Sequence, residues 1–236
     1  MKGSVAISVI VPAFNEEKYI KYVFEGLRSQ TFRDFETIVV DKDSTDRTRE
    51  IASKYARVIV EKREGIGIAR NAGARAAKGG VLVFLDADTR PSKGLLEAYR
   101  ASFKDAAIVA ATGPILPLEK TTRRVNMGYR FVSVLFVRLS ILFGRPSVVG
   151  SNFAVRKRVF DAVGGFNEKF ATYEDWDLSL RLRKMGRIAY IMGAVAYTSV
   201  RRIKAWGMFG FFIYHSLNIV RYHLFGRPNE EYEPVR

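Results

Sequence analysis

The sequence contains no cysteine and only two histidines, His215 and His223, among its 236 residues. The absence of cysteine excludes disulfides, thiolate nucleophiles and cysteine-based zinc or iron–sulfur sites, and it fits a reducing compartment. With so few imidazoles, a bound metal would be held mainly by oxygen ligands, which favours Mg²⁺ or Mn²⁺ over zinc. We expect the two histidines to be ordinary members of a helix rather than metal ligands.

Acidic residues are also scarce, because 24 Asp and Glu stand against 39 Lys and Arg and give a formal net charge of +15. Such a chain is expected to meet nucleic acid, phosphorylated small molecules or acidic lipid headgroups, and charge alone leaves the three open. A hydrophobic content of 48% lets the chain bury a core without cross-links, which excludes a disordered tail protein. Residues 1–4 lead into a short apolar run ended by Pro12, so we expect no secretory signal.

The first hundred residues predict an α/β fold. Short runs rich in β-branched residues recur at the spacing of βαβ units: Ile7–Val11, Thr37–Asp41, Arg57–Val60 and Val81–Asp86. Helical patterns separate them over Glu16–Gln30 and Ala69–Ala77. The run VLVFL is continuously apolar, as expected of a strand covered on both faces. We therefore predict a mostly parallel sheet flanked by helices.

The second half is less regular. It predicts strands within Val148–Val155, Ile188–Ile191 and Val195–Thr198 and helices over Val159–Val163 and Trp176–Lys184. The apolar stretch Arg123–Gly144 is interrupted by arginines, so we expect it to lie on the core or on a surface rather than to cross a bilayer. We predict one main domain over residues 1–200 and a basic, aromatic helical segment over 201–236.

Carboxylates follow the predicted strands at their carboxyl ends, where ligands bind in open α/β sheets. Asp86 and Asp88 come directly after VLVFL and could hold one divalent cation, although this pattern alone favours Asp88 as a cap of the turn that follows. Asp41 ends the second strand and could accept a hydrogen bond from a base N–H or a ribose. Ser44 and Asp46 are expected to cap the next helix.

Two further groups stand out. Gly65 and Gly67 invite a dinucleotide-binding interpretation, but the third glycine position is Arg70, so we reject it. We expect Arg70 instead to start a helix whose N-terminus faces an anion. Glu174 and Asp175 begin a predicted helix, where the macrodipole favours acids in any case; either could also deprotonate a hydroxyl.

Six blocks of the sequence together resemble family 2 glycosyltransferases of the GT-A fold. They are VIVPAFNEE (9–17), VVDKDSTDRT (39–48), GIGIARNAGARAA (65–77), FLDADT (84–89), VVGSNFAVRKRVFDAVGGFNEKF (148–170) and YEDWDLSLRLRKMG (173–186). Their order and spacing match the family over residues 6–200. The resemblance implies a nucleotide-binding α/β domain merged with an acceptor-binding half.

The resemblance also assigns roles to residues. Pro12, Phe14, Glu16 and Asp41 would line the nucleoside pocket, with Arg70 near the base or phosphates. Asp86 and Asp88 would form the family's DxD motif, which binds ribose and a divalent metal, Mn²⁺ or Mg²⁺. Asp175 would be the catalytic base, with Glu174 beside it.

The activity so implied is inverting transfer of a sugar from a nucleoside-diphosphate donor, a UDP-sugar first, to a hydroxyl acceptor. Lys42 stands where many members of the family have a second aspartate, which leaves the identity of the donor's nucleobase open. A clear Gln-x-x-Arg-Trp motif, typical of processive members, is missing, since Arg202 and Trp206 echo it only loosely. We therefore expect transfer of single sugars.

The segment Arg201–Arg227 combines aromatic and basic residues. It predicts a helix in the headgroup plane of an anionic membrane, or equally one packed on the core or on a second subunit. The first alternative implies a lipid-linked acceptor and a protein at the cytoplasmic face of the cell membrane. The competing functions are a non-catalytic nucleic-acid-binding module and a sugar nucleotidyltransferase. We expect neither, because no nucleic-acid-binding motif and no glycine-rich loop after the first strand occur.

Overall fold

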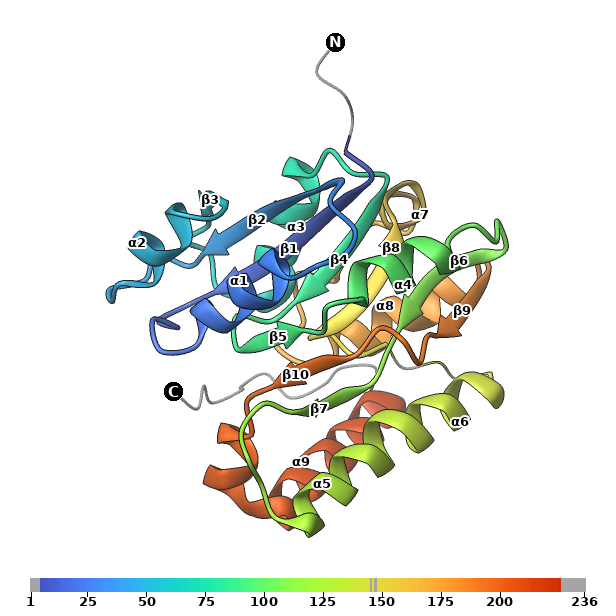
Figure 1. Ribbon diagram of the computed structural model, residues 1–236. Coiled ribbons are helices and arrows are strands. Elements are labelled where there is room, and N and C mark those ends of the chain that lie inside the picture. Colours follow the sequence, from blue (N-terminus) through green and yellow to red (C-terminus); the bar gives the residue numbers. More distant parts are fainter. Residues whose placement is uncertain (1–4, 145, 147, 226–236) are drawn as a thin grey trace.

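A seven-stranded sheet forms the centre of the computed structural model, which describes residues 5–144, 146 and 148–225 (Figure 1). The strands lie in the order β3-β2-β1-β4-β8-β6-β9. Their bounds are β1 Ile7–Ala13, β2 Phe35–Asp41, β3 Arg57–Val60, β4 Val81–Leu85, β6 Ile108–Thr112, β8 Asn152–Arg156 and β9 Arg187–Tyr190. The predicted α/β class and mostly parallel sheet are confirmed.

Alternating side chains of the strands feed two separate cores, one on each face of the sheet. Val9 and Val11 of β1 pack with α1 (Ile20–Arg28) and α4 (Leu95–Ser102), while Ile10 faces α3 (Ile66–Ala76). This alternation follows from the two-residue period of a strand. The short α2 (Thr48–Ser53) lies by β3, and α7 (Lys157–Ala162) and α8 (Glu174–Arg183) cover the face of α3.

Strand β8 is the antiparallel member of the sheet. It pairs with β4 on one side and with β6 on the other, and so joins the N-terminal half to the later strands. A second, three-stranded sheet has the order β5-β10-β7, formed by Thr89–Pro91, Ala196–Thr198 and Ile115–Pro117. It lies below the main sheet in Figure 1, next to the end of β4.

The apolar stretch after β7 forms α5 (Arg123–Arg130), the π-helical turn η1 (Phe131–Phe136) and α6 (Val137–Leu142). Of the described residues, this 20-residue run alone is long and apolar enough to cross a membrane by length and composition. The expectation that its arginines make it too broken for that was wrong, because an 18-residue window holds no more than two charges.

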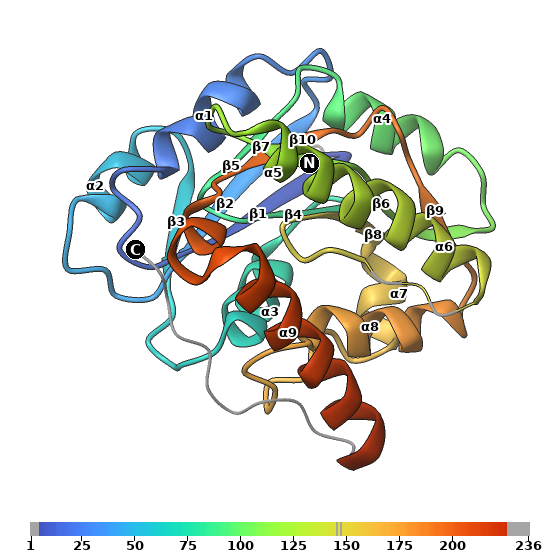
Figure 2. The ribbon, with the colours of Figure 1, turned by 90° about the horizontal axis from the view of Figure 1, so that it is seen from below.

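Helix α9 (Arg201–Phe225) follows β10 and is kinked at Gly207, whose φ is 70°. Figure 2, seen from below, shows α9 and the α5–α6 run on the same side of the molecule. The proposed boundary at residue 200 stays a prediction. The part of the C-terminal segment beyond 225, like residues 1–4, lies outside the described residues.

Candidate active site

Two loops at the carboxyl ends of β1 and β2 are tied together by hydrogen bonds from backbone N–H groups. Asn15 N donates to Ser44 Oγ (3.0 Å), Glu16 N to Thr48 Oγ1 (2.6 Å) and Glu17 N to Asp46 Oδ2 (3.1 Å). Neither Ser44 nor Asp46 is the N-cap of α2, which is Arg47 and has no side-chain cap hydrogen bond. Asp46, one residue earlier, accepts from Thr48 N (2.9 Å), and Ser44 bridges the loops. The bonds hold this edge of the sheet in one arrangement.

Asp41 ends β2 and is fully buried. Its Oδ2 accepts hydrogen bonds from Ser44 N and Arg49 Nε, both at 3.0 Å. Among the described residues, its Oδ1 has no hydrogen-bond partner. A buried acceptor without a donor is costly, so this oxygen is suited to a donor that a ligand brings.

Phe14 lies in the loop directly after β1, two residues beyond Pro12, which pairs with Val40 of β2. The Lys42 ammonium lies 4.6 Å from the centre of the Phe14 ring and 2.9 Å from Glu64 Oε1. The predicted nucleoside-pocket residues Pro12, Phe14 and Asp41 are therefore brought to neighbouring strand ends. The Lys42 ammonium lies at this same edge of the sheet.

Arg70 lies at the centre of a carboxylate cluster formed by Asp86, Glu174 and Asp175. Its position in the helix differs from the prediction. It lies inside α3 rather than at the start, because the helix begins at Ile66, and only 2% of it is exposed. Its Nη1 donates to Glu174 Oε1 (2.5 Å) and its Nη2 to Asp86 Oδ1 (2.9 Å). Gly150 makes room, since a Cβ there would lie 2.6 Å from Arg70 Nη2. The guanidinium thus joins carboxylates from two distant segments.

Glu174 and Asp175 open α8 behind Tyr173, whose φ of 62° is left-handed. Asp175 Oδ2 accepts from Gly150 N (2.9 Å) and its Oδ1 from Trp176 N (2.8 Å). Burial raises the pKa of Asp175, and Arg70 and the Gly150 N–H oppose that rise. Burial likewise raises the pKa of Glu174 to about 7, with Asp175 adding to the rise and Arg70 opposing it.

Asp88 lies apart from Arg70 and pairs with a different arginine, Arg201. Thr198 Oγ1 donates to its Oδ1 (3.2 Å), and Arg201 Nη2 lies 3.2 Å from its Oδ2. Arg201 also donates to both carboxylate oxygens of Glu16. Burial raises the pKa of Asp88 to about 7, against the lowering effect of Arg201. The first residue of α9 thereby reaches the predicted metal carboxylate.

The two carboxylates of the DxD motif therefore face different arginines, Asp86 facing Arg70 and Asp88 facing Arg201. In the described part of the chain, no three His, Cys, Asp or Glu side chains group together as a metal site. The ligand chemistry still fits a hard cation, because carboxylate oxygens of a partly buried pair suit Mg²⁺ or Mn²⁺ completed by phosphate oxygens and water.

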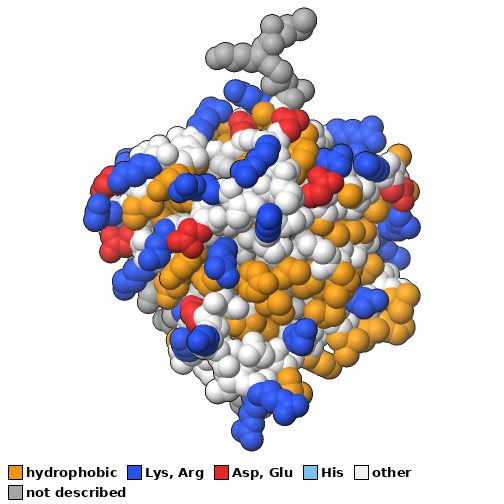
Figure 3. Space-filling model, in the orientation of Figure 1, with side chains coloured by type: hydrophobic (Ala, Val, Ile, Leu, Met, Phe, Trp, Pro, Cys, Tyr) orange, Lys and Arg blue, Asp and Glu red, His pale blue; other side chains and the backbone are white. Residues whose placement is uncertain are grey.

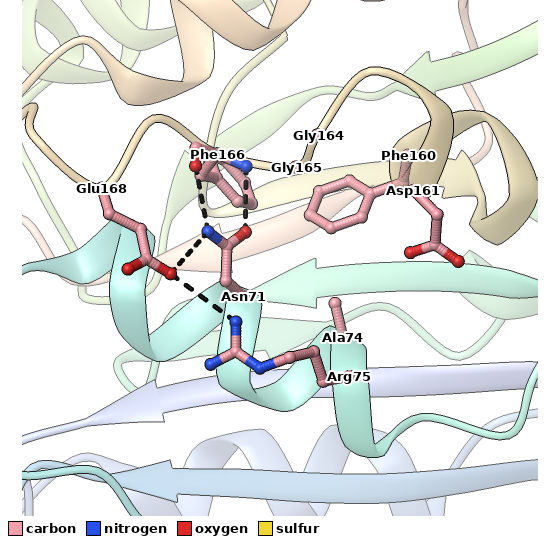
Figure 4. Close-up of a pocket in the computed structure, with 9 residues that line it drawn as sticks. All are labelled: Asn71, Ala74, Arg75, Phe160, Asp161, Gly164, Gly165, Phe166 and Glu168. Carbon is pink, nitrogen blue, oxygen red and sulfur yellow. Dashed lines mark hydrogen bonds and ion pairs between the residues drawn. The ribbon is translucent and has the colours of Figure 1, made fainter.

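A pocket beside α3 adjoins this cluster (Figure 4). The ring of Phe166, which lines the pocket, lies with its centre 5.4 Å from the guanidinium carbon of Arg70. The Asn71 amide spans it, donating to Phe166 O (2.9 Å) and accepting from Phe166 N (2.9 Å). Glu168 accepts from Asn71 and Arg63, both at 3.1 Å. These polar groups hold the Gly164–Gly165 turn against α3, so the pocket is structural.

Sequence reasoning missed three residues of the site: Gly150, which lies beside Arg70 and Asp175, and Thr198 and Arg201, which contact Asp88. Thr198 and Arg201 lie more than 100 positions from Asp88, and no spacing rule links them. Gly150 stood in a quoted block, VVGSNF, but its role depends on the closeness of Arg70 and Asp175. The only sign in the sequence that Gly150 matters was its place in a block that resembles the family.

The chain is similar to known glycosyltransferases in sequence and in fold. Residues 8–164 match Glycosyl transferase family 2. The chain is 30% identical over 201 residues to the O-antigen chain rhamnosyltransferase WbaN of Salmonella anatum, covering 78% of this chain and 63% of that protein. It is 26% identical over 197 residues to chondroitin synthase of Escherichia coli, covering 78% of this chain and 27% of that one.

Two solved structures share the fold. The mannosyltransferase PcManGT from Pyrobaculum calidifontis, in complex with GDP-Man and Mn²⁺, matches with a TM-score of 0.68 and 22% identity over 92% of this chain and 65% of that one. S. aureus TarS 1–349 in complex with UDP-GlcNAc matches with a TM-score of 0.66 and 24% identity, over 82% of this chain and 58% of that one. The chain thus spans only part of each relative.

Proposed function

The chain belongs to glycosyl transferase family 2, and from that premise we propose that it moves a single sugar, with inversion, from a nucleoside-diphosphate donor to a hydroxyl acceptor. The observation that supports this best is the cluster in which Arg70 joins Asp86, at the end of β4, to Glu174, next to Asp175. A single guanidinium thus links the carboxylate on the donor side of the site to the acidic residues on the side of the catalytic base.

The donor base would bind at the ends of β1 and β2. Asp41 Oδ1 is buried without a partner among the described residues, so it can accept one N–H from a base. Uracil and guanine each carry a ring N–H, whereas cytosine does not. We propose a UDP-sugar as donor, with a GDP-sugar as the alternative; UDP-GlcNAc and GDP-Man are bound in the two similar structures.

A divalent cation, Mn²⁺ or Mg²⁺, would be held by Asp88 and Asp86 together with the donor diphosphate. When bound, it would neutralise the charge that the leaving diphosphate gains. The similar mannosyltransferase structure contains Mn²⁺, which supports this assignment. Asp88 would have to exchange its contact with Arg201 for the cation, leaving that guanidinium to Glu16 and to the phosphates.

Asp175 would take the proton of the acceptor hydroxyl. The acceptor oxygen forms a bond to the anomeric carbon as the bond from that carbon to the phosphate oxygen breaks, and the nucleoside diphosphate leaves with the electron pair. A base with a raised pKa is suited to this, because proton uptake then becomes more favourable near neutral pH. The Gly150 N–H holds the carboxylate in place.

The acceptor and its location belong to the same proposal. We place transfer at the cytoplasmic face of the cell membrane, on a lipid-linked acceptor. The basic and aromatic residues of 201–227 support this placement, since they suit an anionic interface. Transfer of radiolabelled sugar into an organic-solvent extract would support a lipid acceptor, and incorporation only into water-soluble products would exclude it.

The donor assignment can be tested by thermal shift with UDP, GDP and CDP, each with and without Mn²⁺. We expect UDP to raise Tm, more so with Mn²⁺, since a ligand that binds the native state stabilises it. Asp88→Asn should lose the Mn²⁺-dependent part, while Asp161→Asn, an exposed acid paired with Lys157, should keep it. Equal shifts with all nucleotides, or a full Mn²⁺ effect in Asp88→Asn, would contradict the assignment.

A further inference from the structure

The helical run Arg123–Leu142 carries two opposite rows of side chains, each spaced by four residues. The outer row, Met127, Phe131, Leu135 and Leu139, exposes 60%, 59%, 46% and 39% of its surface. Leu142 and Phe143 continue this exposed apolar surface. Figure 3 shows it as the hydrophobic patch over the α5–α6 region on the lower right of this face.

The inner row fixes the run to the protein. Ser133 Oγ donates to Ile115 O of β7 (2.8 Å), and Tyr190 OH of β9 donates to Ser133 O (2.6 Å). Val137 is 2% exposed, and Ile141 packs against the core. A helix tied down along one row cannot cross a bilayer without breaking these contacts, so it can only lie on a surface.

The π-helical turn η1 keeps the outer row straight. In an α-helix each residue advances about 100°, so a four-residue step drifts by about 40°. A π-helix has more residues per turn, so each residue advances less and the drift is reversed over Phe131–Phe136. The exposed apolar side chains therefore form one line rather than a spiral, and a line suits a flat partner.

Charge indicates what the partner is. The sequence from 120 to 160 contains nine Lys and Arg and no Asp or Glu, and the same holds for 178–229, which includes α9. Arg123, Arg124, Arg130 and Arg138 are exposed on the run itself. A second copy meeting this face through two-fold symmetry would set these cations against each other. An anionic surface would attract them.

We propose that the outer row of α5, η1 and α6 lies in the headgroup plane of an anionic lipid bilayer, with its exposed arginines on the lipid phosphates. Helix α9, with Ile213 and Leu217 exposed one turn apart, lies on the same side of the molecule (Figure 2) and would share the contact.

The test is flotation of the full chain with phosphatidylcholine vesicles, with and without phosphatidylglycerol. We expect binding that needs phosphatidylglycerol and falls in 0.5 M salt, since surface charge is screened. The variant Phe131→Ser/Leu135→Ser/Leu139→Ser should bind the vesicles at least about tenfold more weakly than the parent does, because it loses apolar area. Val60→Ser/Met185→Ser, equally exposed elsewhere, should bind as the parent does.

Arg123→Gln/Arg124→Gln/Arg130→Gln should weaken binding and flatten its salt dependence. Nucleotide thermal shifts on every variant report the fold and the donor site, so failure of the proposed transfer reaction leaves this test intact. Three results would overturn the proposal: a parent chain that ignores anionic vesicles at low salt, resistance to carbonate extraction as of a spanning helix, or a triple serine variant that changes only a dimer into a monomer.

Discussion

At the scale of single residues, Arg70 holds two carboxylates of the site together. It is a buried cation between Asp86 and Glu174, and its Nε has no partner in the described part of the chain. A buried ion pair costs desolvation and is kept where both partners remain hydrogen-bonded. Here the guanidinium fork satisfies two carboxylates at once, a geometry that a lysine could not reproduce.

Asp175→Asn should retain nucleotide binding and lower transfer by about 10²-fold or more, because the amide cannot take the acceptor proton. The Asn oxygen can still accept from the Gly150 N–H, and only the contact with the Trp176 N–H is lost, so the fold should persist. Single-turnover transfer and nucleotide titration on the same preparation separate the two effects. Near-normal turnover would show that another acidic residue acts as the general base.

Glu174 should make stability depend on pH. Its pKa rises from 4.5 in the unfolded chain to about 7 in the native one, so the native state holds more protons between these values. The free energy of unfolding should therefore fall as pH rises from about 5 to 7, by on the order of 1–3 kcal/mol for this carboxyl.

Urea unfolding at several pH values, without metal or nucleotide, measures that fall. Glu174→Gln has no proton to lose, and its stability should change less over the same range. Parallel curves for the parent and Glu174→Gln would show that this carboxyl is not the source.

At the scale of elements, the close approach of α3 to β1 depends on a small residue. A Cβ on Gly73 would overlap Ile10 Cγ2 and lie 3.1 Å from Val40 Cγ2. Gly73→Ala should cost about 1–3 kcal/mol, since the helix must shift from the sheet. Gly80→Ala, with open space around it, should be neutral or slightly stabilising. Thermal or urea unfolding compares them, and equal stabilities would contradict the close packing.

The strands of the main sheet could be predicted because their signals are local. VLVFL and the runs around Val39 and Val9 are short, apolar and followed by acids, and all form strands ending at the site. Arg70 was misplaced because Gly65, with φ of 127°, lets α3 begin four residues earlier. The π-helical turn could not be predicted, because the sequence of Phe131–Phe136 is also compatible with an α-helix. The hydrogen bonds of a π-helix produce no sequence pattern that distinguishes the two.

At the scale of the whole molecule, α9 touches the site at two points. Arg201 contacts Glu16 and Asp88, and further along Asn218 Nδ2 donates to Thr172 Oγ1 (3.1 Å), two residues before Glu174. Tyr222 OH donates to Asp177 Oδ1 of α8 (3.2 Å). The C-terminal helix therefore supports the acidic end of the site as well as its donor end. The pairing of distant segments is what sequence spacing could not supply.

Asn218→Leu should lower kcat several-fold while leaving donor affinity unchanged, because the hydrogen bond from Asn218 to Thr172 is lost and the segment leading to Asp175 loosens. Lys204→Gln, an exposed change on the same helix, is the control. Steady-state kinetics over both substrates makes the distinction. A rise in donor KM with kcat unchanged would place the effect of Asn218 at the other end of the site.

The place of β8 between β4 and β6 has a consequence for synthesis. β4 is complete at residue 85, but its second partner begins only at residue 152. At roughly 5–20 residues per second, the ribosome needs several seconds to make the residues between them. During that interval VLVFL presents an open apolar edge to the cell. A nascent chain halted near residue 140 should therefore be a substrate for chaperones, and one halted well beyond residue 190 should have closed that edge.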